Sequence, residues 1–248
     1  MPAGTTGRPR FLASVTDAAE ALTALAAGAD IIDCKNPADG ALGALPHVTV
    51  QAIVDAVAHR VPVSATVGDL APDPGLLTAA VTAMAATGVD LVKIGVFAGG
   101  DAKASVAALG RLELGRVRLV GLLLADRDPD FGLVADMASA GFAGVMLDTA
   151  AKDGRGLPDV MAPVRIADFV TLAREWNLFS GLAGSLSIGH IASVGAFGPD
   201  IMGFRGALCA GTRRLGPLEE GAVRAVAREL ALLGRRPTAR HAILEATP

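Results

Sequence analysis

The residues that could do chemistry in this chain are its lysines. The chain has four lysines against 18 arginines, and three of the lysines lie at or near the ends of short apolar runs. These three are Lys35, Lys93 and Lys152, whereas Lys103 lies in a polar segment typical of a surface helix. Arginine stays protonated in proteins, but a lysine can lose its proton when it is desolvated or close to other cations. A neutral amine can form an imine with a carbonyl or act as a base, so the pattern indicates Schiff-base or proton-transfer chemistry.

Carboxylates accompany these lysines. Asp33 lies two residues before Lys35, so in a strand both side chains point to one face and Cys34 points to the other. We place Asp33 among the residues that could bind substrate. Asp148 ends the apolar run that precedes the third lysine, where it could orient an amine or carry its proton. The simpler interpretation of any one lysine is an ion pair with Asp33, Asp148 or Asp153, but three lysines converging in a lysine-poor chain favour the chemical interpretation.

A second group of residues could bind phosphate. Gly184 and Ser185 close the seventh apolar run, and Arg205 and Gly206 close the eighth. In (β/α)8 barrels the loops after strands seven and eight often form a phosphate site from backbone N–H groups. The glycines permit close backbone approach, Ser185 adds a hydroxyl donor, and Arg205 could clamp a phosphate with two hydrogen bonds. The alternative is that the glycines serve tight turns and Arg205 pairs with an acidic neighbour.

Two other features lie close to the expected site. Ser64 and Thr66 stand at the end of the third apolar run, where their hydroxyls could bind substrate. Residues 36–46 form a loop rich in glycine and proline directly after Lys35. This loop could be a lid over the site or a simple turn, because loops carry function often but not reliably.

The elements that must position these residues are short apolar runs that alternate with longer amphipathic or alanine-rich stretches. We expect strands at 11–15, 29–34, 61–67, 90–95, 118–125, 143–148, 179–184 and 200–206. We expect helices at 17–27, 47–58, 76–87, 101–113, 131–140, 165–176, 187–195 and 219–233. The runs are almost continuously apolar, as in parallel strands that are buried on both faces. Eight consecutive β-then-α units predict an α/β fold, a single (β/α)8 TIM barrel whose reacting groups gather at the C-terminal ends of the strands; a doubly wound open sheet is the alternative.

Composition excludes several classes of protein. A net charge of −3, 4% aromatic residues and no tyrosine argue against a nucleic-acid partner. No apolar run is long enough to span a membrane, and the first residues lack the apolar core of a signal peptide. The two cysteines form no CxxC motif, which fits a reducing compartment. We therefore expect a cytoplasmic protein with one domain over residues 1–248, a core over about 10–233 and a tail after about 235.

Six segments occur along the chain in an order that is typical of one family. They are GADIIDCKNP, VSATVGD, VKIG, MLDTA, LAGS and RGALC. Together they resemble the (5-formylfuran-3-yl)methyl phosphate synthase family, also called 4-(hydroxymethyl)-2-furancarboxaldehyde-phosphate synthase. The resemblance covers roughly residues 10–233 and implies a barrel similar to that of class I aldolases.

The resemblance also implies an activity and roles for individual residues. A member of this family is a lyase of methanofuran biosynthesis. It condenses two molecules of glyceraldehyde 3-phosphate into the phosphorylated furan aldehyde, with loss of one phosphate and water. By motif, Lys35 matches the Schiff-base lysine and Lys93 the proton acceptor. Asp148 and Lys152 match further active-site groups.

Two other functions remain open from the sequence. A different Schiff-base aldolase of sugar phosphates would use the same lysines, and a non-catalytic sensor of a phosphorylated ligand would keep the barrel and its phosphate loops. We expect no metal ion or other cofactor, because the histidines show no metal-ligand spacing. These histidines are His47, His59, His190 and His241. The expected partners are triose phosphates, with no nucleic acid and no membrane, and the apolar composition is compatible with a homo-oligomer.

Overall fold

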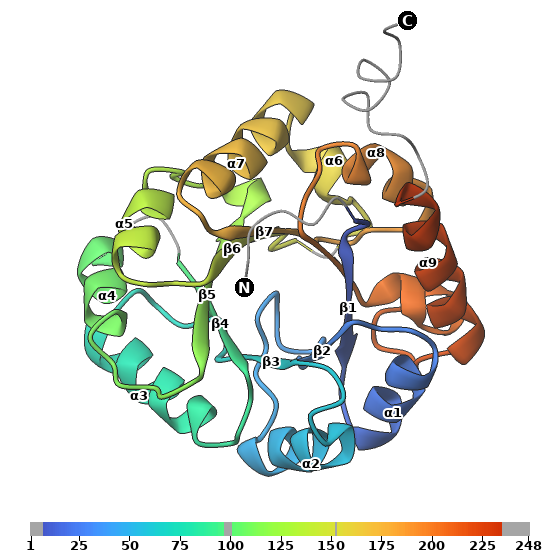
Figure 1. The fold of residues 1–248 in the computed structure, drawn as a ribbon, viewed down its shortest axis with the longest axis horizontal. Coiled ribbons are helices and arrows are strands. Elements are labelled where there is room, and N and C mark those ends of the chain that lie inside the picture. Colours follow the sequence, from blue (N-terminus) through green and yellow to red (C-terminus); the bar gives the residue numbers. More distant parts are fainter. Residues whose placement is uncertain (1–6, 97–100, 152, 235–248) are drawn as a thin grey trace, which may run out of the picture.

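The protein is a closed barrel of parallel strands surrounded by helices (Figure 1). The computed structural model describes residues 7–96, 101–151 and 153–234. Each strand pairs in parallel with the next strand in the chain, and β8 pairs with β1 to close the ring. The predicted (β/α)8 barrel is therefore confirmed, and the alternative of an open doubly wound sheet is wrong.

The strands and helices alternate along the chain. The strands are β1 (Arg10–Val15), β2 (Ile31–Cys34), β3 (Val63–Thr66), β4 (Leu91–Gly95), β5 (Arg118–Leu124), β6 (Gly144–Asp148), β7 (Phe179–Leu182) and β8 (Ile201–Phe204). The α-helices are α1 (Ala18–Ala26), α2 (His47–Val57), α3 (Pro74–Ala85), α4 (Ala102–Leu109), α5 (Leu133–Ser139), α6 (Leu157–Val160), α7 (Pro163–Glu175), α8 (Ile191–Gly195) and α9 (Glu220–Leu233). Short 3-10 helices are η1 (Ala125–Arg127), η2 (Ile188–His190), η3 (Gly206–Leu208) and η4 (Ala210–Thr212). Within the described ranges, none of the helices has the length and apolar character needed to cross a membrane.

Local sequence explains how the chain turns between helices and strands. Helix α1 is capped by Asp17, the residue before it, whose carboxylate accepts the backbone N–H of Glu20 at 2.9 Å. Such a cap satisfies an N–H that has no partner in the first turn of a helix. Gly28 and Gly88 follow α1 and α3 with φ values of 103° and 88°. Glycine adopts this left-handed conformation without steric penalty, so the chain can turn at once into the next strand.

Some elements differ from the sequence-based expectation. The stretch 187–195 is divided into η2 and α8 rather than forming one helix. Helix α7 begins at Pro163, earlier than expected, because a proline in the first turn forfeits no helical hydrogen bond. The sequence does not predict α6, a single turn held by the fully buried Leu157. The expected tail after about 235 lies outside the described residues.

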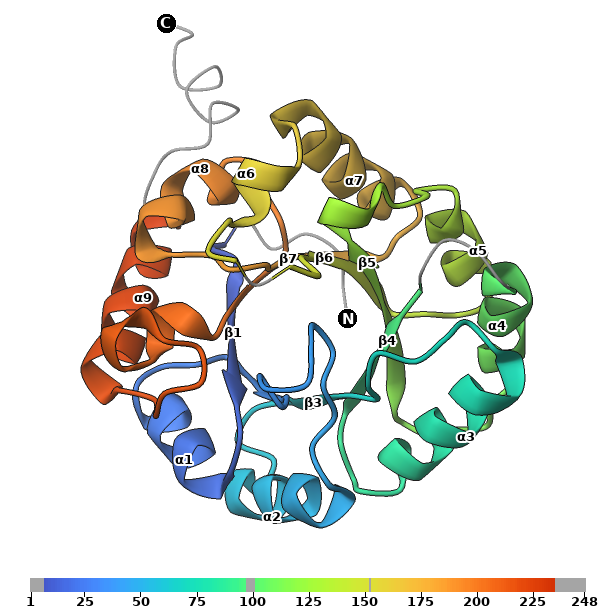
Figure 2. The same cartoon turned by 180° about the vertical axis from the view of Figure 1, so that it is seen from behind.

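Side-chain alternation along each strand creates two separate apolar layers. In β2, Ile31 belongs to a cluster inside the barrel, whereas Ile32 and Cys34 pack in a larger cluster between the strands and the helices. Figures 1 and 2 show that the helices form a ring outside the strands. Apolar side chains at inward-facing strand positions therefore fill the interior of the barrel beneath the C-terminal ends of the strands. On β1, β2, β4 and β6 the inward positions nearer the C-terminal ends carry the polar residues described next.

Candidate active site

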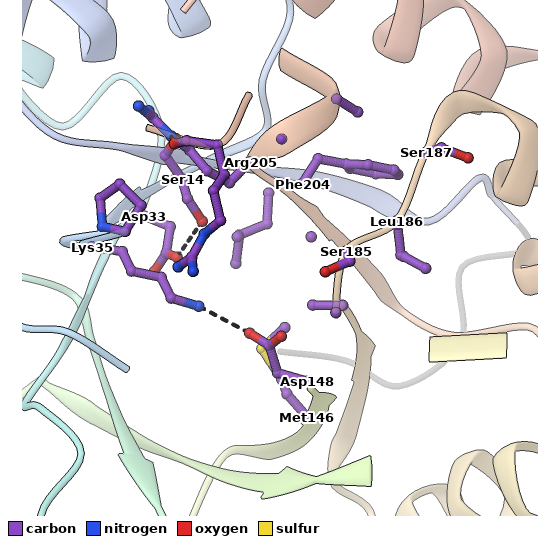
Figure 3. A pocket seen from close by; sticks show the side chains of 18 of the residues that line it. Ser14, Asp33, Lys35, Met146, Asp148, Ser185, Leu186, Ser187, Phe204 and Arg205 are labelled. Atoms are coloured by element: carbon purple, nitrogen blue, oxygen red, sulfur yellow. Dashed lines mark hydrogen bonds and ion pairs between the residues drawn. The ribbon is translucent and has the colours of Figure 1, made fainter. Parts of the chain in front are cut away.

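A cavity of about 360 Å³ opens at the C-terminal ends of the barrel strands (Figure 3). Its lining includes Asp33, Lys35, Lys93 and Asp148, which come from β2, β4 and β6 or directly follow them. Parallel strands in a closed barrel bring their C-terminal ends to one mouth. Residues that are more than 100 positions apart in the chain therefore share one small volume.

Lys35 and Asp148 form an ion pair across this cavity. Lys35 directly follows β2 and Asp148 ends β6, and Figure 3 shows their side chains pointing toward each other. The Lys35 Nζ lies 2.9 Å from Asp148 Oδ2, and the two side chains are 9% and 6% exposed. The other oxygen of Asp148 accepts the backbone N–H of Thr149 at 2.7 Å. The carboxylate is thus fixed in orientation while it faces the amine.

Lys93 and Asp33 form a second buried ion pair, with 2.7 Å between Lys93 Nζ and Asp33 Oδ1. Asp33 also accepts hydrogen bonds from the hydroxyls of Ser14 at 2.8 Å and Ser64 at 2.7 Å. Strand register explains this set, because Ser14 and Ser64 are the direct neighbours of Asp33 on β1 and β3. Side chains that lie opposite one another on adjacent strands contact each other.

Burial and neighbouring charges shift the pKa values of this second pair. Burial alone would raise the pKa of Asp33, but the charges of Lys93 and Lys35 and the hydrogen bonds from Lys93 and Ser64 outweigh it and lower that pKa. Burial lowers the pKa of Lys93, the Asp33 carboxylate opposes this effect, and the charge of Lys35 adds to it. Asp33 is therefore held ionised, while Lys93 releases its proton more readily than an exposed lysine does.

Ser64 and Thr66 do not line the cavity. They contact residues that form its wall. Ser64 donates its hydroxyl to Asp33, as described above, and Thr66 Oγ1 donates to the carbonyl of Gly43 at 2.9 Å. Both side chains are fully buried. In this structure they position a carboxylate and a loop; their predicted contact with substrate stays a prediction.

The loop of residues 36–46 folds into the barrel mouth. Asp69 accepts the backbone N–H groups of Ala41 and Leu42 at 3.0 and 3.1 Å. Leu42 is fully buried and packs in the cluster inside the barrel. The loop is the blue segment that reaches into the ring of strands in Figure 2. Pro37 in this loop lines the cavity, so the loop forms one wall of the site.

The segments after β7 and β8 form the opposite wall. Gly184, Ser185 and Gly206 line the cavity together with Ser187 and Ala207. Gly184 has φ +103°, and a Cβ at this position would lie 2.8 Å from Thr149 Cγ2 and 2.9 Å from Thr149 N. Only glycine fits there without displacing the chain that follows Asp148. The phosphate site expected at these residues stays a prediction.

Arg205 lines the cavity, but its guanidinium is engaged elsewhere. Nε donates to the carbonyl of Arg214 at 2.9 Å, Nη1 to the carbonyl of Ser14 and to Glu20, and Nη2 to Glu20 and to the carbonyl of Gly216. A guanidinium has five N–H donors, so each of them has an acceptor. The ion pair with an acidic neighbour, which is the alternative drawn from the sequence, is present as Arg205–Glu20.

Several residues that shape the site are missing from the sequence-based prediction. Ser14 could have been found from alternation in β1, because it lies two residues after the inward-facing Leu12. Glu20 and Arg214 could not have been found in this way, because their positions near the site depend on contacts between segments that are distant in the sequence. The predicted active-site residue Lys152 lies outside the described residues. Cys34 faces the helices, and burial raises the pKa of its thiol, so it is not a nucleophile of this site.

Comparisons with known proteins show which family this sequence is similar to. The sequence profile of the family described as 4-HFC-P synthase matches residues 11–227. A Methylorubrum extorquens protein, provisionally named a (5-formylfuran-3-yl)methyl phosphate synthase, is 47% identical over 207 residues, covering 84% of this chain and 85% of its own. The (5-formylfuran-3-yl)methyl phosphate synthase of Methanopyrus kandleri is 39% identical, covering 90% of this chain and all of its own, 100%.

Solved structures with little sequence identity share the fold. The phosphoribosyl anthranilate isomerase of Thermus thermophilus has a TM-score of 0.62 at 16% identity, covering 90% of this chain and 99% of its own. A structure described as native KDPGal has a TM-score of 0.60 at 14% identity, covering 91% of this chain and 94% of its own. At such identities the likeness concerns the barrel alone.

Proposed function

This chain belongs to the 4-HFC-P synthase family, and we propose that it makes (5-formylfuran-3-yl)methyl phosphate from two molecules of glyceraldehyde 3-phosphate through a Schiff base on Lys35. The chain is an enzyme, a lyase-type synthase. The observation that carries the mechanism is the pair of buried lysines, each held by its own carboxylate, in one cavity. The product would serve methanofuran biosynthesis.

The overall reaction balances without any oxidant or reductant. Two triose phosphates supply all six carbons of the furan aldehyde, one phosphate is eliminated, and two molecules of water are lost. The imine costs no net water, because one water leaves when it forms and one returns when it is hydrolysed. The work of the protein is therefore to activate a carbonyl and to move protons.

In the first step the amine of Lys35 attacks the carbonyl of one triose phosphate. The attacking amine must be neutral, so its proton has to leave beforehand. Asp148 Oδ2, 2.9 Å from Nζ, is placed to take that proton and to return it to the departing hydroxyl. The resulting iminium withdraws electrons from the adjacent carbon and makes its C–H acidic.

In the second step a base removes the proton from that carbon. We assign this role to Lys93, because burial lowers its pKa and therefore raises the neutral fraction near pH 7. The enamine then attacks the aldehyde carbon of the second triose phosphate and forms the carbon–carbon bond. Asp33 accepts from Lys93 throughout, which keeps the amine close to the reacting carbon after it has taken the proton.

The later steps eliminate phosphate and water and close the aromatic ring. Asp148 is a carboxylate again once the imine has formed, so it can take a further proton from a substrate carbon or hydroxyl and pass that proton to a later leaving hydroxyl. Lys152, which lies outside the described residues, is proposed as its partner in this proton transfer. The backbone near Gly184, Ser185 and Gly206 is proposed to hold a substrate phosphate, since these residues line the cavity.

Product analysis tests the proposed function and separates it from the other two candidates. Incubation with glyceraldehyde 3-phosphate should yield an ultraviolet-absorbing furan aldehyde and one inorganic phosphate for every two trioses consumed. Lys35→Arg should abolish both signals, whereas the matched control Lys103→Arg should keep them, because Lys103 is 74% exposed and outside the cavity. A product without phosphate release would identify a different aldolase, and binding without any product would identify a sensor.

A further inference from the structure

Arg214 is a second arginine at the cavity, and its situation differs from that of Arg205. Arg214 lies between η4 and α9, lines the cavity and is half-buried. Its guanidinium donates one hydrogen bond within the described part of the chain, from Nη2 to the carbonyl of Gly40 at 3.0 Å. The other donors of this guanidinium therefore have no acceptor among the described residues.

We propose that Arg214 binds the phosphate of a triose phosphate and that Arg205 positions it, an assignment that rests on the proposed function. Within the described ranges Arg214 forms no ion pair with a carboxylate, although it is partly removed from water. Burial of a cation costs free energy that a carboxylate in direct contact would offset, and an anionic ligand in the cavity would supply that contact. A guanidinium suits phosphate because its N–H groups form two parallel hydrogen bonds to two oxygens.

The position of Arg214 within the cavity supports this role. Burial lowers the pKa of Arg214, and among the charges that act on it is the carboxylate of Asp148. Arg214, Lys35 and Asp148 line the same cavity, so a molecule bound there lies between the arginine and the ion pair. A phosphate bound by Arg214 would place the carbonyl of a short three-carbon substrate near the two amines.

Arg205 and Glu20 hold the backbone from which Arg214 projects. Arg205 donates to the carbonyls of Arg214 and Gly216 at 2.9 and 3.0 Å, and Glu20 accepts the N–H of Leu218 at 3.1 Å. These bonds fix the loop at Arg214 and in the four residues that follow it. The ion pair between Arg205 and Glu20 joins this loop to α1. Arg205 therefore acts through Arg214 and not on the phosphate itself.

The reaction also calls for a second anion site. Two triose phosphates bring two phosphate groups into one cavity, and the segment 184–187 after β7 contributes glycine, serine and leucine but no cation. Backbone N–H groups there can hold one phosphate. Arg214, which projects from the β8–α9 connection beside loop 36–46, supplies the charge for the other.

The test is the affinity for glycerol 3-phosphate, which has the phosphate of the substrate but no carbonyl and so cannot react. Isothermal titration calorimetry should show that glycerol 3-phosphate binds to the wild type. Added glycerol, which has no phosphate, should not weaken this binding. Arg214→Gln should weaken it about ten-fold or more, which corresponds to about 1.4 kcal/mol. The matched control is Arg213→Gln, because Arg213 is the exposed neighbour in the same loop and does not line the cavity. This control should stay within about two-fold of the wild type.

Each outcome decides the assignment. Equal affinity in Arg214→Gln and the wild type would overturn it, as would a wild type that does not bind glycerol 3-phosphate. Arg214→Lys, which keeps the charge but loses the paired donors, should bind with intermediate affinity and so excludes misfolding as the cause of the loss. A role of Arg214 in holding Gly40 alone would lower thermal stability and leave the affinity unchanged. The measurement needs no turnover, so a wild type that binds but makes no furan would refute the proposed function and leave the Arg214 site intact.

Discussion

Two lysines and two aspartates among the described residues of the cavity form two ion pairs. Lys35 and Lys93 are balanced by Asp148 and Asp33, with separations of 2.9 and 2.7 Å. Isolated charges at such depth would be very unfavourable, whereas paired and hydrogen-bonded charges are tolerated. The same pairing provides each amine with a proton acceptor. A proton can therefore move from an amine to its paired carboxylate without a change in the charge of that pair.

At the residue scale, the charge of Asp33 controls the protonation of Lys93. An ionised Asp33 favours the protonated amine and so raises the pKa of Lys93, whereas burial lowers it. If Lys93 is the base, the rate must rise with pH as the amine loses its proton, at a pH below the ordinary lysine value of 10.5. Asp33→Asn removes the opposing charge, so the rising limb of kcat/KM against pH should move to still lower pH. A limb that stays in place or moves upward would show that Lys93 is not the base.

Removing the amine of Lys93 should also destabilise the protein. Lys93→Met leaves the fully buried Asp33 carboxylate without its cation. Breaking a buried pair in this way costs about 3–5 kcal/mol of unfolding free energy. Urea unfolding measures the loss. The matched control Lys103→Met removes an exposed pair with a separation of 3.6 Å and should change stability by less than about 1 kcal/mol. Equal effects of the two substitutions would contradict the buried pair.

At the scale of elements, the β2–α2 loop depends on one carboxylate. Asp69 accepts two consecutive backbone N–H groups, those of Ala41 and Leu42, and Leu42 fills the barrel interior. Asp69→Ala should leave these N–H groups without their acceptor, at a cost of about 1–3 kcal/mol. Hydrogen exchange should accelerate at residues 40–43 and remain slow in β2 itself. Unchanged protection of the loop would show that Leu42 alone holds it.

A second carboxylate makes the same arrangement after β6. Asp126 in η1 accepts the N–H groups of Ala150 and Ala151, both at 2.7 Å. The loops after β2 and β6 are thus each tied down by an acidic residue of a neighbouring segment. These two loops follow the residues of the Lys35–Asp148 pair. The geometry of that pair therefore depends on residues that do not line the cavity.

At the scale of the whole molecule, the repeated β-then-α pattern was enough to predict the barrel. Alternation then put Asp33 and Lys35 on the inner face and Cys34 on the outer face, as the structure has them. The sequence could not assign each lysine to its carboxylate, because Lys35 meets Asp148, 113 positions away, rather than the adjacent Asp33. That choice depends on the closure of the barrel, which no local pattern contains.

The hydrogen-bond partners of Arg205 and Arg214 could not be predicted from the sequence either. The motif around Arg205 suggested a phosphate clamp, but the register of β8 and the return of the chain toward α1 place Glu20 and three carbonyls around it. The sequence assigns no role to Arg214, because it follows Arg213 in a segment without a recognisable motif. Hydrogen-bond partners supplied by distant loops distinguish the two arginines, and such partners appear only in three dimensions.

Covalent trapping tests the central claim, that Lys35 forms an imine with the substrate. Borohydride added during reaction with glyceraldehyde 3-phosphate should reduce the imine to a stable secondary amine, and peptide mass mapping should locate the added mass on Lys35. The adduct should disappear in Lys35→Arg and persist in Lys103→Arg. Absence of an adduct in the wild type, its location on another lysine, or normal turnover by Lys35→Arg would contradict the mechanism.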